Sequence, residues 1–198
     1  MSTAEILHQK FNRRSDQIPP VRIKGFNRGK LAMLFGELGY KRGAEIGVAE
    51  GKNSLVLCEQ VPDLELYCVD LWDVYYRAKF KLKSKAKQDE ALGLSHEKLD
   101  QYEATFIHKP SMKAVEDFED KSLDFVYIDA DHAFDFVMQD IIEWSKKVRP
   151  GGIVSGHDYY RFRGAGVVDA VNAYTNAHQI NEWFLTDERT PSFFWAMP

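Results

Sequence analysis

The sequence predicts a doubly wound α/β fold, with seven strands in a mostly parallel sheet, helices on both faces and an antiparallel last pair of strands. Short apolar segments alternate with amphipathic ones, which is typical of parallel strands joined by crossover helices. Several apolar segments, such as LDFVYI at 123–128, are continuous, as expected of strands covered on both faces. The 198 residues suit one domain, 1–198.

Five parallel strands are expected at 43–48, 65–71, 104–109, 123–129 and 152–157. A helix is predicted over 134–148 because Val137, Ile141 and Trp144 recur at helical spacing, and Asp140 is assigned to its polar face. The RPGG sequence at 149–152 is expected to stop this helix, since proline cannot continue it and glycine permits a reversal. Another helix is expected at 167–178, followed by two strands, 182–187 and 192–197, paired antiparallel.

The composition excludes several classes of protein. With 44% hydrophobic and 28% charged residues, the chain is neither disordered nor of low complexity. Only Cys58 and Cys68 are present, too few for a disulfide scaffold, and their spacing is not that of a metal finger. No apolar run is long enough to span a membrane and the first residues do not resemble a signal peptide, so we expect a cytoplasmic protein without membrane partners.

One short segment is strongly basic although the net charge is −4. Residues 77–87 contain six Lys and Arg residues and no acidic residue. They belong to a long connection, 73–102, that we expect to form a lid-like insertion, and 1–25 is expected to form an N-terminal cover. A solvated helix or loop is favoured for 77–87, and nucleic-acid binding or contact with an anionic small substrate stays open.

A glycine turn follows the first expected strand. Gly47 and Gly51 let the backbone turn tightly and approach a ligand, and Asn53 or Ser54 is expected to open the next helix, whose free N–H groups attract a carboxylate or phosphate. The G-x-G-x-x-G dinucleotide pattern fails here in either register. Nearby carboxylates would disfavour a pyrophosphate and favour a ligand with an amino group and a sulfonium.

An acid at the end of the next strand completes the pattern. Asp70 comes 19 residues after Gly51, close to the offset of about 20 residues at which an acid reaches ribose hydroxyls. Strand, turn, helix and acid together therefore indicate a nucleoside-type ligand. An ordinary tight turn at Gly47 and Gly51, with Asp70 as a strand-end cap, is the alternative.

Four segments carry a family resemblance. AEIGVAEG at 44–51 resembles the first motif of class I S-adenosylmethionine-dependent methyltransferases, and VDLW at 69–72, YIDADH at 127–132 and RPGGIVSGHDY at 149–159 resemble the later ones. The closest likeness is to the small bacterial and archaeal branch related to catechol-type and macrolide-sugar O-methyltransferases. This resemblance implies a Rossmann-like fold and S-adenosylmethionine as cofactor.

The resemblance also implies roles for individual residues. Glu45, Gly47 and Gly51 would hold the methionine part of the cofactor, and Ser54 could receive its carboxylate. Asp70 would bind the ribose, and Trp72 would lie near the adenine. Ser111 matches a position that borders the adenine, and it could equally cap the helical segment 112–118.

Two acids and two histidines are expected to converge at the rim of the predicted site, which is the carboxyl-terminal edge of the sheet. Asp129 and Asp158 follow two strands that would be about 4.8 Å apart as neighbours, and His132 and His157 lie in the same rim. Asp129, Asp158 and His157 could hold Mg²⁺ or another divalent cation, which would lower the pKa of an acceptor hydroxyl. His132 is the candidate general base.

The resemblance supports this arrangement with one departure. Metal-dependent relatives carry two acids or Asp-Asn where this chain has His157 and Asp158, so a softer ion or metal-free catalysis stays open. The predicted activity is O-methylation of a small-molecule acceptor. A metal-dependent nucleotide-sugar transferase that uses Asp129 and Asp131, and a catalytically silent nucleotide- or S-adenosylmethionine-binding module, are the alternatives. A homodimer is compatible with the sequence.

Overall fold

The structure is a computed structural model that describes residues 1–14, 17–74, 76–77, 80–81, 84–162 and 164–198. Much of the basic segment 77–87, and with it the question of nucleic-acid binding there, lies outside the described residues. Among the described residues, no helix has the length and apolar character needed to cross a membrane.

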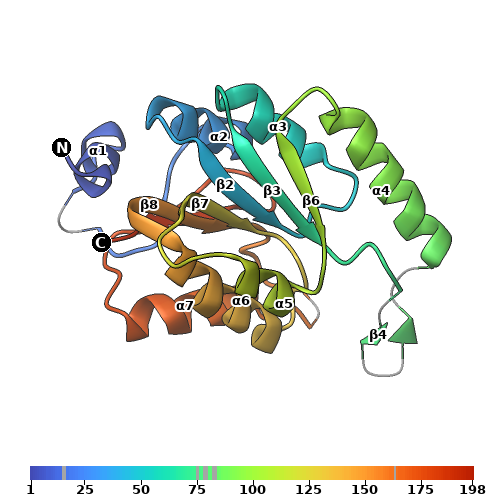
Figure 1. Cartoon of the computed structure of the whole chain (residues 1–198). Helices are drawn as coiled ribbons and strands as arrows, with labels where there is room; N and C mark the ends of the chain where they lie inside the picture. Colours follow the sequence, from blue (N-terminus) through green and yellow to red (C-terminus); the bar gives the residue numbers. More distant parts are fainter. Residues whose placement is uncertain (15–16, 75, 78–79, 82–83, 163) are drawn as a thin grey trace.

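One sheet forms the centre of the molecule (Figure 1). Its strands in chain order are β1 (Val21–Arg22), β2 (Arg42–Ile46), β3 (Glu65–Asp70), β6 (Ala104–His108), β7 (Leu123–Ile128), β8 (Val148–Gly156), β9 (Phe184–Leu185) and β10 (Phe193–Ala196). Their order across the sheet is β1-β9-β10-β8-β7-β2-β3-β6. All neighbours are parallel except β10, which runs antiparallel to both β8 and β9, so the predicted doubly wound sheet with an antiparallel end is confirmed.

Helices cover both faces of this sheet (Figure 1). They are α1 (Thr3–Lys10), α2 (Arg28–Glu37), α3 (Lys52–Gln60), α4 (Lys85–Leu99), α5 (Ser111–Ala114), α6 (Phe134–Lys147) and α7 (Val167–Ala177), and a 3₁₀ turn, η1 (Val115–Asp117), follows α5. Helices α2, α3 and α4 lie on one face, and α5, α6 and α7 lie on the other.

The continuous apolar sequence of β7 is explained by these two layers. Phe125 and Tyr127 pack into the core beneath α2 and α3, whereas Val126 and Ile128 pack into the core beneath α6 and α7. Successive side chains of a strand point to opposite faces, so a strand with a helix layer on each side requires apolar residues at every position.

Three local expectations are corrected. The sheet has eight strands rather than seven, because β1 from the expected N-terminal cover pairs in parallel with β9. Strand β8 begins at Val148 rather than at residue 152, so the RPGG sequence lies within it, although α6 ends at Lys147 just before this sequence and Gly151 has the left-handed φ of +75° that a reversal uses. Half of the expected insertion 73–102 is the regular helix α4, whose Ala91 and Leu99 are buried in the core, and β4 (Tyr76–Arg77) and β5 (Phe80–Lys81) form a small separate hairpin.

The face assigned to Asp140 is also corrected. Its side chain is only 4% exposed rather than on the polar surface of α6. Asp140 lies three residues after Val137 and four before Trp144, both of which are buried, and such spacings place residues on the same side of a helix. A carboxylate is therefore enclosed within the apolar face of α6.

Candidate active site

The glycine turn brings two strand ends into close contact. Gly47 has φ +92°, and a Cβ atom on it would lie 2.2 Å from the carbonyl oxygen of Asp129, so only glycine fits this position. Gly51 has a left-handed backbone and is the N-cap of α3, which begins at Lys52 and not at Asn53 or Ser54 as expected. The turn after β2 is thereby packed against the residue that follows β7.

Asp70 holds this turn in place. Its Oδ2 accepts hydrogen bonds from the backbone N–H groups of Val48, at 2.9 Å, and Ala49, at 2.8 Å, while Oδ1 accepts one from the N–H of Trp72 at 3.2 Å. A carboxylate that accepts backbone N–H groups fixes the loop that carries them. Asp70 therefore shapes the turn in addition to facing the cavity described below.

Glu45 and Ser54 form a closed network beneath the turn. Glu45 is 1% exposed and accepts hydrogen bonds from the Ser54 hydroxyl and from the Asn53 side-chain amide, the latter at 2.8 Å. Burial raises the pKa of Glu45 to about 7, although these hydrogen bonds oppose the shift. Ser54 has no exposed surface and already donates to Glu45, so the expectation that it receives a ligand carboxylate is corrected.

A cavity of about 520 Å³ opens at the carboxyl ends of β2, β3 and β7, beside α5 and α6. Parallel strands of this fold class are expected to bind ligands at this edge. Of the predicted cofactor-binding residues, Gly47, Asp70, Ser111 and Asp129 line the cavity, whereas Glu45, Gly51, Ser54 and Trp72 do not. The remaining wall is largely apolar and includes Leu71, Met112 and Phe136.

Trp72 supports the site from inside the core, which corrects its expected place beside the adenine. Its side chain is 2% exposed and packs against Phe106 and His108, with ring centroids 5.8 and 4.9 Å away. The indole N–H donates to the carbonyl oxygen of Ala49 at 2.9 Å. Leu71, the residue before it, lines the cavity instead.

Ser111 faces the cavity but does not cap α5. The N-cap of α5 is Pro110, without a side-chain capping bond. The Ser111 hydroxyl instead donates to Asp140 and accepts the indole N–H of Trp144 at 2.8 Å. The alternative of Ser111 as a helix cap is therefore wrong.

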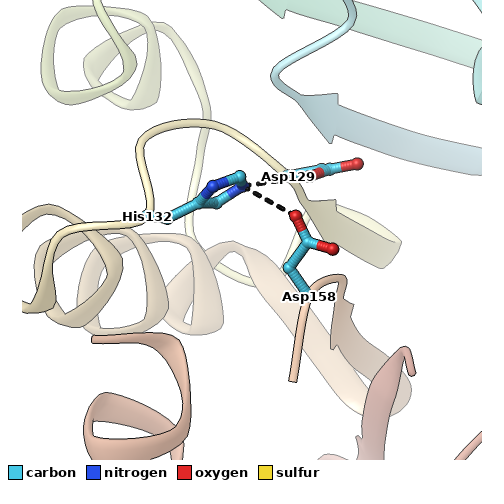
Figure 2. A group of neighbouring side chains, drawn as sticks. All are labelled: Asp129, His132 and Asp158. Carbon is cyan, nitrogen blue, oxygen red and sulfur yellow. Dashed lines mark ion pairs between the residues drawn. The ribbon is translucent and has the colours of Figure 1, made fainter. Parts of the chain in front are cut away.

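Asp129, His132 and Asp158 converge beyond the carboxyl ends of β7 and β8, as Figure 2 shows. The Nε2 atom of His132 lies 3.5 Å from Asp129 Oδ1 and 3.2 Å from Asp158 Oδ2. One candidate ligand atom from each of the three residues lies within 4.8 Å of the others. Within the described part of the chain, they form the group of His, Cys, Asp and Glu residues that could hold a metal ion.

The two carboxylates change the protonation of the histidine. The close approach of the Asp129 carboxylate raises the pKa of His132, against the opposing effect of burial, and the charge of Asp158 raises it further. Burial alone would raise the pKa of Asp158, but its hydrogen bond to His157 and the charges of His157, His132 and Arg28 hold it below its usual value.

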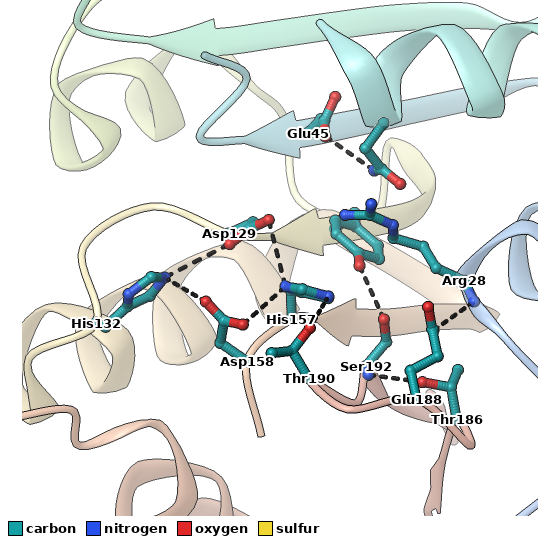
Figure 3. Close-up of polar contacts among 12 residues, drawn as sticks. Arg28, Glu45, Asp129, His132, His157, Asp158, Thr186, Glu188, Thr190 and Ser192 are labelled. Atoms are coloured by element: carbon teal, nitrogen blue, oxygen red, sulfur yellow. Dashed lines mark hydrogen bonds and ion pairs between the residues drawn. The ribbon is translucent and has the colours of Figure 1, made fainter. Parts of the chain in front are cut away.

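His157 also contacts both acids, although it is not in the candidate ligand group (Figure 3). Its Nδ1 is 3.1 Å from Asp158 Oδ1 and 3.7 Å from Asp129 Oδ2, and its Nε2 is 3.4 Å from the Thr190 hydroxyl. Both histidines therefore contact both acids, and they differ in that His132, not the predicted His157, belongs to the group whose atoms could hold one metal ion.

Arg28 enters the site without a sequence signal. Figure 3 shows its side chain extending from the start of α2 toward Glu45 and Asp129. Burial lowers the pKa of Arg28, but Tyr127, Asp129 and Glu188 raise it overall. This position is preceded by the helix cap Asn27 and lies far from every motif in the chain, so only the folded structure brings it to the rim.

Comparisons with known proteins agree with this geometry. A family model described as a methyltransferase domain matches residues 44–159, which include the glycine turn, the cavity and the acidic rim. No curated protein matches the chain. Among solved structures, the O-methyltransferase TomG from Streptomyces achromogenes, in complex with S-adenosylmethionine, is 16% identical, with a TM-score of 0.56 over 99% of this chain and 88% of that one.

Two further solved structures have the same fold. A "putative O-methyltransferase" from Klebsiella pneumoniae is 18% identical, with a TM-score of 0.59 over 99% of this chain and 88% of that one. A "putative rRNA-methylase" from Clostridium thermocellum is 13% identical, with a TM-score of 0.60 over 85% of this chain and 96% of that one. Because the family model covers more than half of the chain, the chain belongs to the methyltransferase-domain family and is a class I S-adenosylmethionine-dependent methyltransferase.

Proposed function

We propose that this methyltransferase transfers the methyl group to an oxygen atom of a small-molecule acceptor, with His132 as general base. The observation that carries the proposal is the position of Asp129, which lines the cavity and also contacts His132. An acceptor hydroxyl at His132 would therefore lie beside a ligand bound in the cavity.

The cavity suits S-adenosylmethionine. Its volume of about 520 Å³ is within the usual range for a cofactor-sized ligand. The close approach of Gly47 to Asp129 forms the floor, and Asp70 offers a carboxylate to the two ribose hydroxyls. Glu45, Gly51 and Ser54 support the turn from beneath. When bound, S-adenosylmethionine supplies the methyl group as an electrophile.

His132 then controls the proton of the acceptor. Its neutral Nε2 atom would accept the hydroxyl proton as the acceptor oxygen bonds to the methyl carbon and the carbon–sulfur bond breaks, which would leave S-adenosylhomocysteine as the product. Asp129 and Asp158, at 3.5 and 3.2 Å, stabilise the imidazolium that results. The half-buried position of the three side chains limits access of water to this proton transfer.

The same residues fit a divalent cation. The Nε2 atom of His132 is buried, and no described residue forms a hydrogen bond with it. It lies between two carboxylates, and this set of oxygen and nitrogen donors suits Mg²⁺ or a softer divalent ion. Asp129, His132 and Asp158 would hold such an ion, which would lower the pKa of the acceptor hydroxyl. His132 would then be a ligand and not the base.

A product assay tests the proposal. The protein is incubated with S-adenosylmethionine and a panel of phenols, sugars and a structured RNA, and S-adenosylhomocysteine is measured with Mg²⁺ or with EDTA. We expect product with a hydroxylated small molecule, and His132→Ala should lower turnover about 10²- to 10⁴-fold with unchanged affinity for S-adenosylhomocysteine. His8→Ala, on the exposed surface, is the control.

Other results would contradict the proposal. Thermal stabilisation by a UDP-sugar with metal, and not by S-adenosylhomocysteine, would favour the nucleotide-sugar transferase. Binding of S-adenosylhomocysteine without product from any acceptor would favour the silent module. Methylation of the RNA alone would replace the small-molecule acceptor by a nucleic acid.

A further inference from the structure

Asp140 is a buried carboxylate that the reaction described above does not use. Its side chain is 4% exposed and lies in α6 among apolar residues. Among the described residues, no Lys, Arg or His forms an ion pair with it, and Asp131 is the charged neighbour that acts on its titration. An unpaired carboxylate is costly to bury, so its presence in this wall needs a cause other than packing.

Two neighbours fix the orientation of this carboxylate. The indole N–H of Trp144 donates to the Ser111 hydroxyl at 2.8 Å, and that hydroxyl in turn donates to Asp140 Oδ1. Trp144 has no exposed surface, so the chain of hydrogen bonds starts from a fixed ring. Asp140 Oδ1 is therefore occupied and its side chain cannot turn away.

The second oxygen of the Asp140 carboxylate has no donor among the described residues. Asp140 lines the cavity, and no described protein group donates a hydrogen bond to its Oδ2. Burial raises the pKa of Asp140 to about 7, against the effect of the Ser111 hydroxyl. A hydrogen-bond donor on the ligand would offset this cost of burial, whereas an acceptor there would add to it.

The position of Asp140 selects one part of the ligand. Asp70 faces the part of the cavity at the end of β3, and Asp129 faces the reacting rim. Helices α5 and α6 contribute another part of the wall, where Met112 and Phe136 provide apolar surface for a planar ring. Adenine is the planar part of S-adenosylmethionine, and its exocyclic amino group is a hydrogen-bond donor.

We infer that Asp140 accepts a hydrogen bond from the exocyclic amino group of adenine and is the residue that selects the base of the methyl donor. Ser111 is its positioning residue. The inference rests on the proposed binding of S-adenosylmethionine in this cavity, and it adds a specificity residue that the motifs do not include.

A pair of ligands that differ at one group tests this. S-inosylhomocysteine carries a carbonyl oxygen where S-adenosylhomocysteine carries the amino group, so it would place an acceptor against Asp140. Affinities are measured by calorimetry at pH 8.5, where the carboxylate is ionised. We expect the wild-type protein to prefer S-adenosylhomocysteine roughly tenfold or more, because the mismatch loses a hydrogen bond to a charged group.

Variants assign the preference to Asp140. In Asp140→Asn the amide can donate or accept, so the preference should fall to within about threefold. Ser111→Ala, which frees the carboxylate to rotate, should reduce the preference partly. Asp135→Asn changes the same charge on the exposed side of the same helix and should keep the wild-type preference.

The outcomes separate the inference from the proposed function. Equal wild-type affinity for the two ligands, or an unchanged preference in Asp140→Asn, would overturn the inference and leave the methyltransferase proposal intact. Failure of the wild-type protein to bind S-adenosylhomocysteine would overturn the proposed cofactor site itself. The ratio of two affinities within one variant does not depend on its overall stability, so a destabilised variant still gives a decisive result.

Discussion

Replacement of Gly47 by alanine tests how the turn after β2 is built. The new Cβ would lie 2.2 Å from the Asp129 carbonyl oxygen and 2.7 Å from the Cα of Ala130, so the oxygen would have to move about 1.2 Å and the Cα about 0.7 Å to reach an ordinary contact of 3.4 Å. The backbone bonds from Gly47 to Val69 and from Asp129 to Ile46, at 2.8 and 2.7 Å, oppose that movement.

The expected cost has two parts. A left-handed backbone costs a residue with a Cβ about 1–2 kcal/mol, and forcing an atom into a packed site costs about 1–3 kcal/mol more. Gly47→Ala should therefore lower the free energy of unfolding by about 2–5 kcal/mol. The shift of Asp129 by about 1 Å should also lower turnover by about 10²-fold, since catalytic geometry tolerates little displacement.

Two matched glycines separate these contributions in urea unfolding experiments. Gly39 has φ +72° but open space around its Cβ position, so Gly39→Ala should cost only the backbone strain, about 1–2 kcal/mol. Gly93 lies inside α4, and no atom lies within 4 Å of where its Cβ would be. Gly93→Ala should therefore raise the free energy of unfolding by about 0.5–1 kcal/mol. If Gly47→Ala costs no more than Gly39→Ala, the close approach to Asp129 does not constrain the turn.

Three further predictions concern charged groups. Asp70→Ala removes the acceptor of two loop N–H groups, so affinity for S-adenosylhomocysteine in calorimetry should fall about tenfold or more, and an unchanged affinity would contradict its role. Because burial raises the pKa of Glu45 to about 7 in the folded state, its proton is held more tightly there than in the unfolded chain, and the free energy of unfolding should fall as pH rises from about 4.5 through 7. Glu45→Gln should reduce the change in the free energy of unfolding between pH 5 and 8 by roughly a few kcal/mol, as measured by urea titration. Equal pH profiles for the two proteins would refute the assignment. If a metal assists the reaction, EDTA should abolish turnover, and Asp158→Asn should raise the Mg²⁺ concentration needed for the half-maximal rate about tenfold or more. Full activity in EDTA would instead show that His132 acts as a base without a metal.

The sequence was sufficient wherever the signal is local. The strand before Gly47, the turn to Gly51 and the acid at position 70 follow one another within about 25 residues, and all three lie where the pattern predicts. The continuous apolar sequence of β7 likewise predicts helices on both faces. These features depend on backbone preferences and on side-chain alternation along one strand, which neighbouring residues determine.

Individual side chains at the site were less predictable. Ser54 follows the turn at a plausible distance from a ligand, yet the packing of α3 on the sheet encloses it against Glu45. Asp140 could have been assigned to the buried face from its spacing to Val137 and Trp144, a signal that its charge obscured. Arg28 had no local signal at all.

The sequence by itself determined the order of the seven predicted strands, the glycine turn and the set of acids at the strand ends. Tertiary structure decided which of them meet: the adjacency of β7 and β8 places Asp129 beside Asp158, and the loop after β7 brings His132 to both acids. The physical reason is that these contacts join residues up to 29 positions apart. Their distances depend on how whole strands and helices pack, which no short segment encodes.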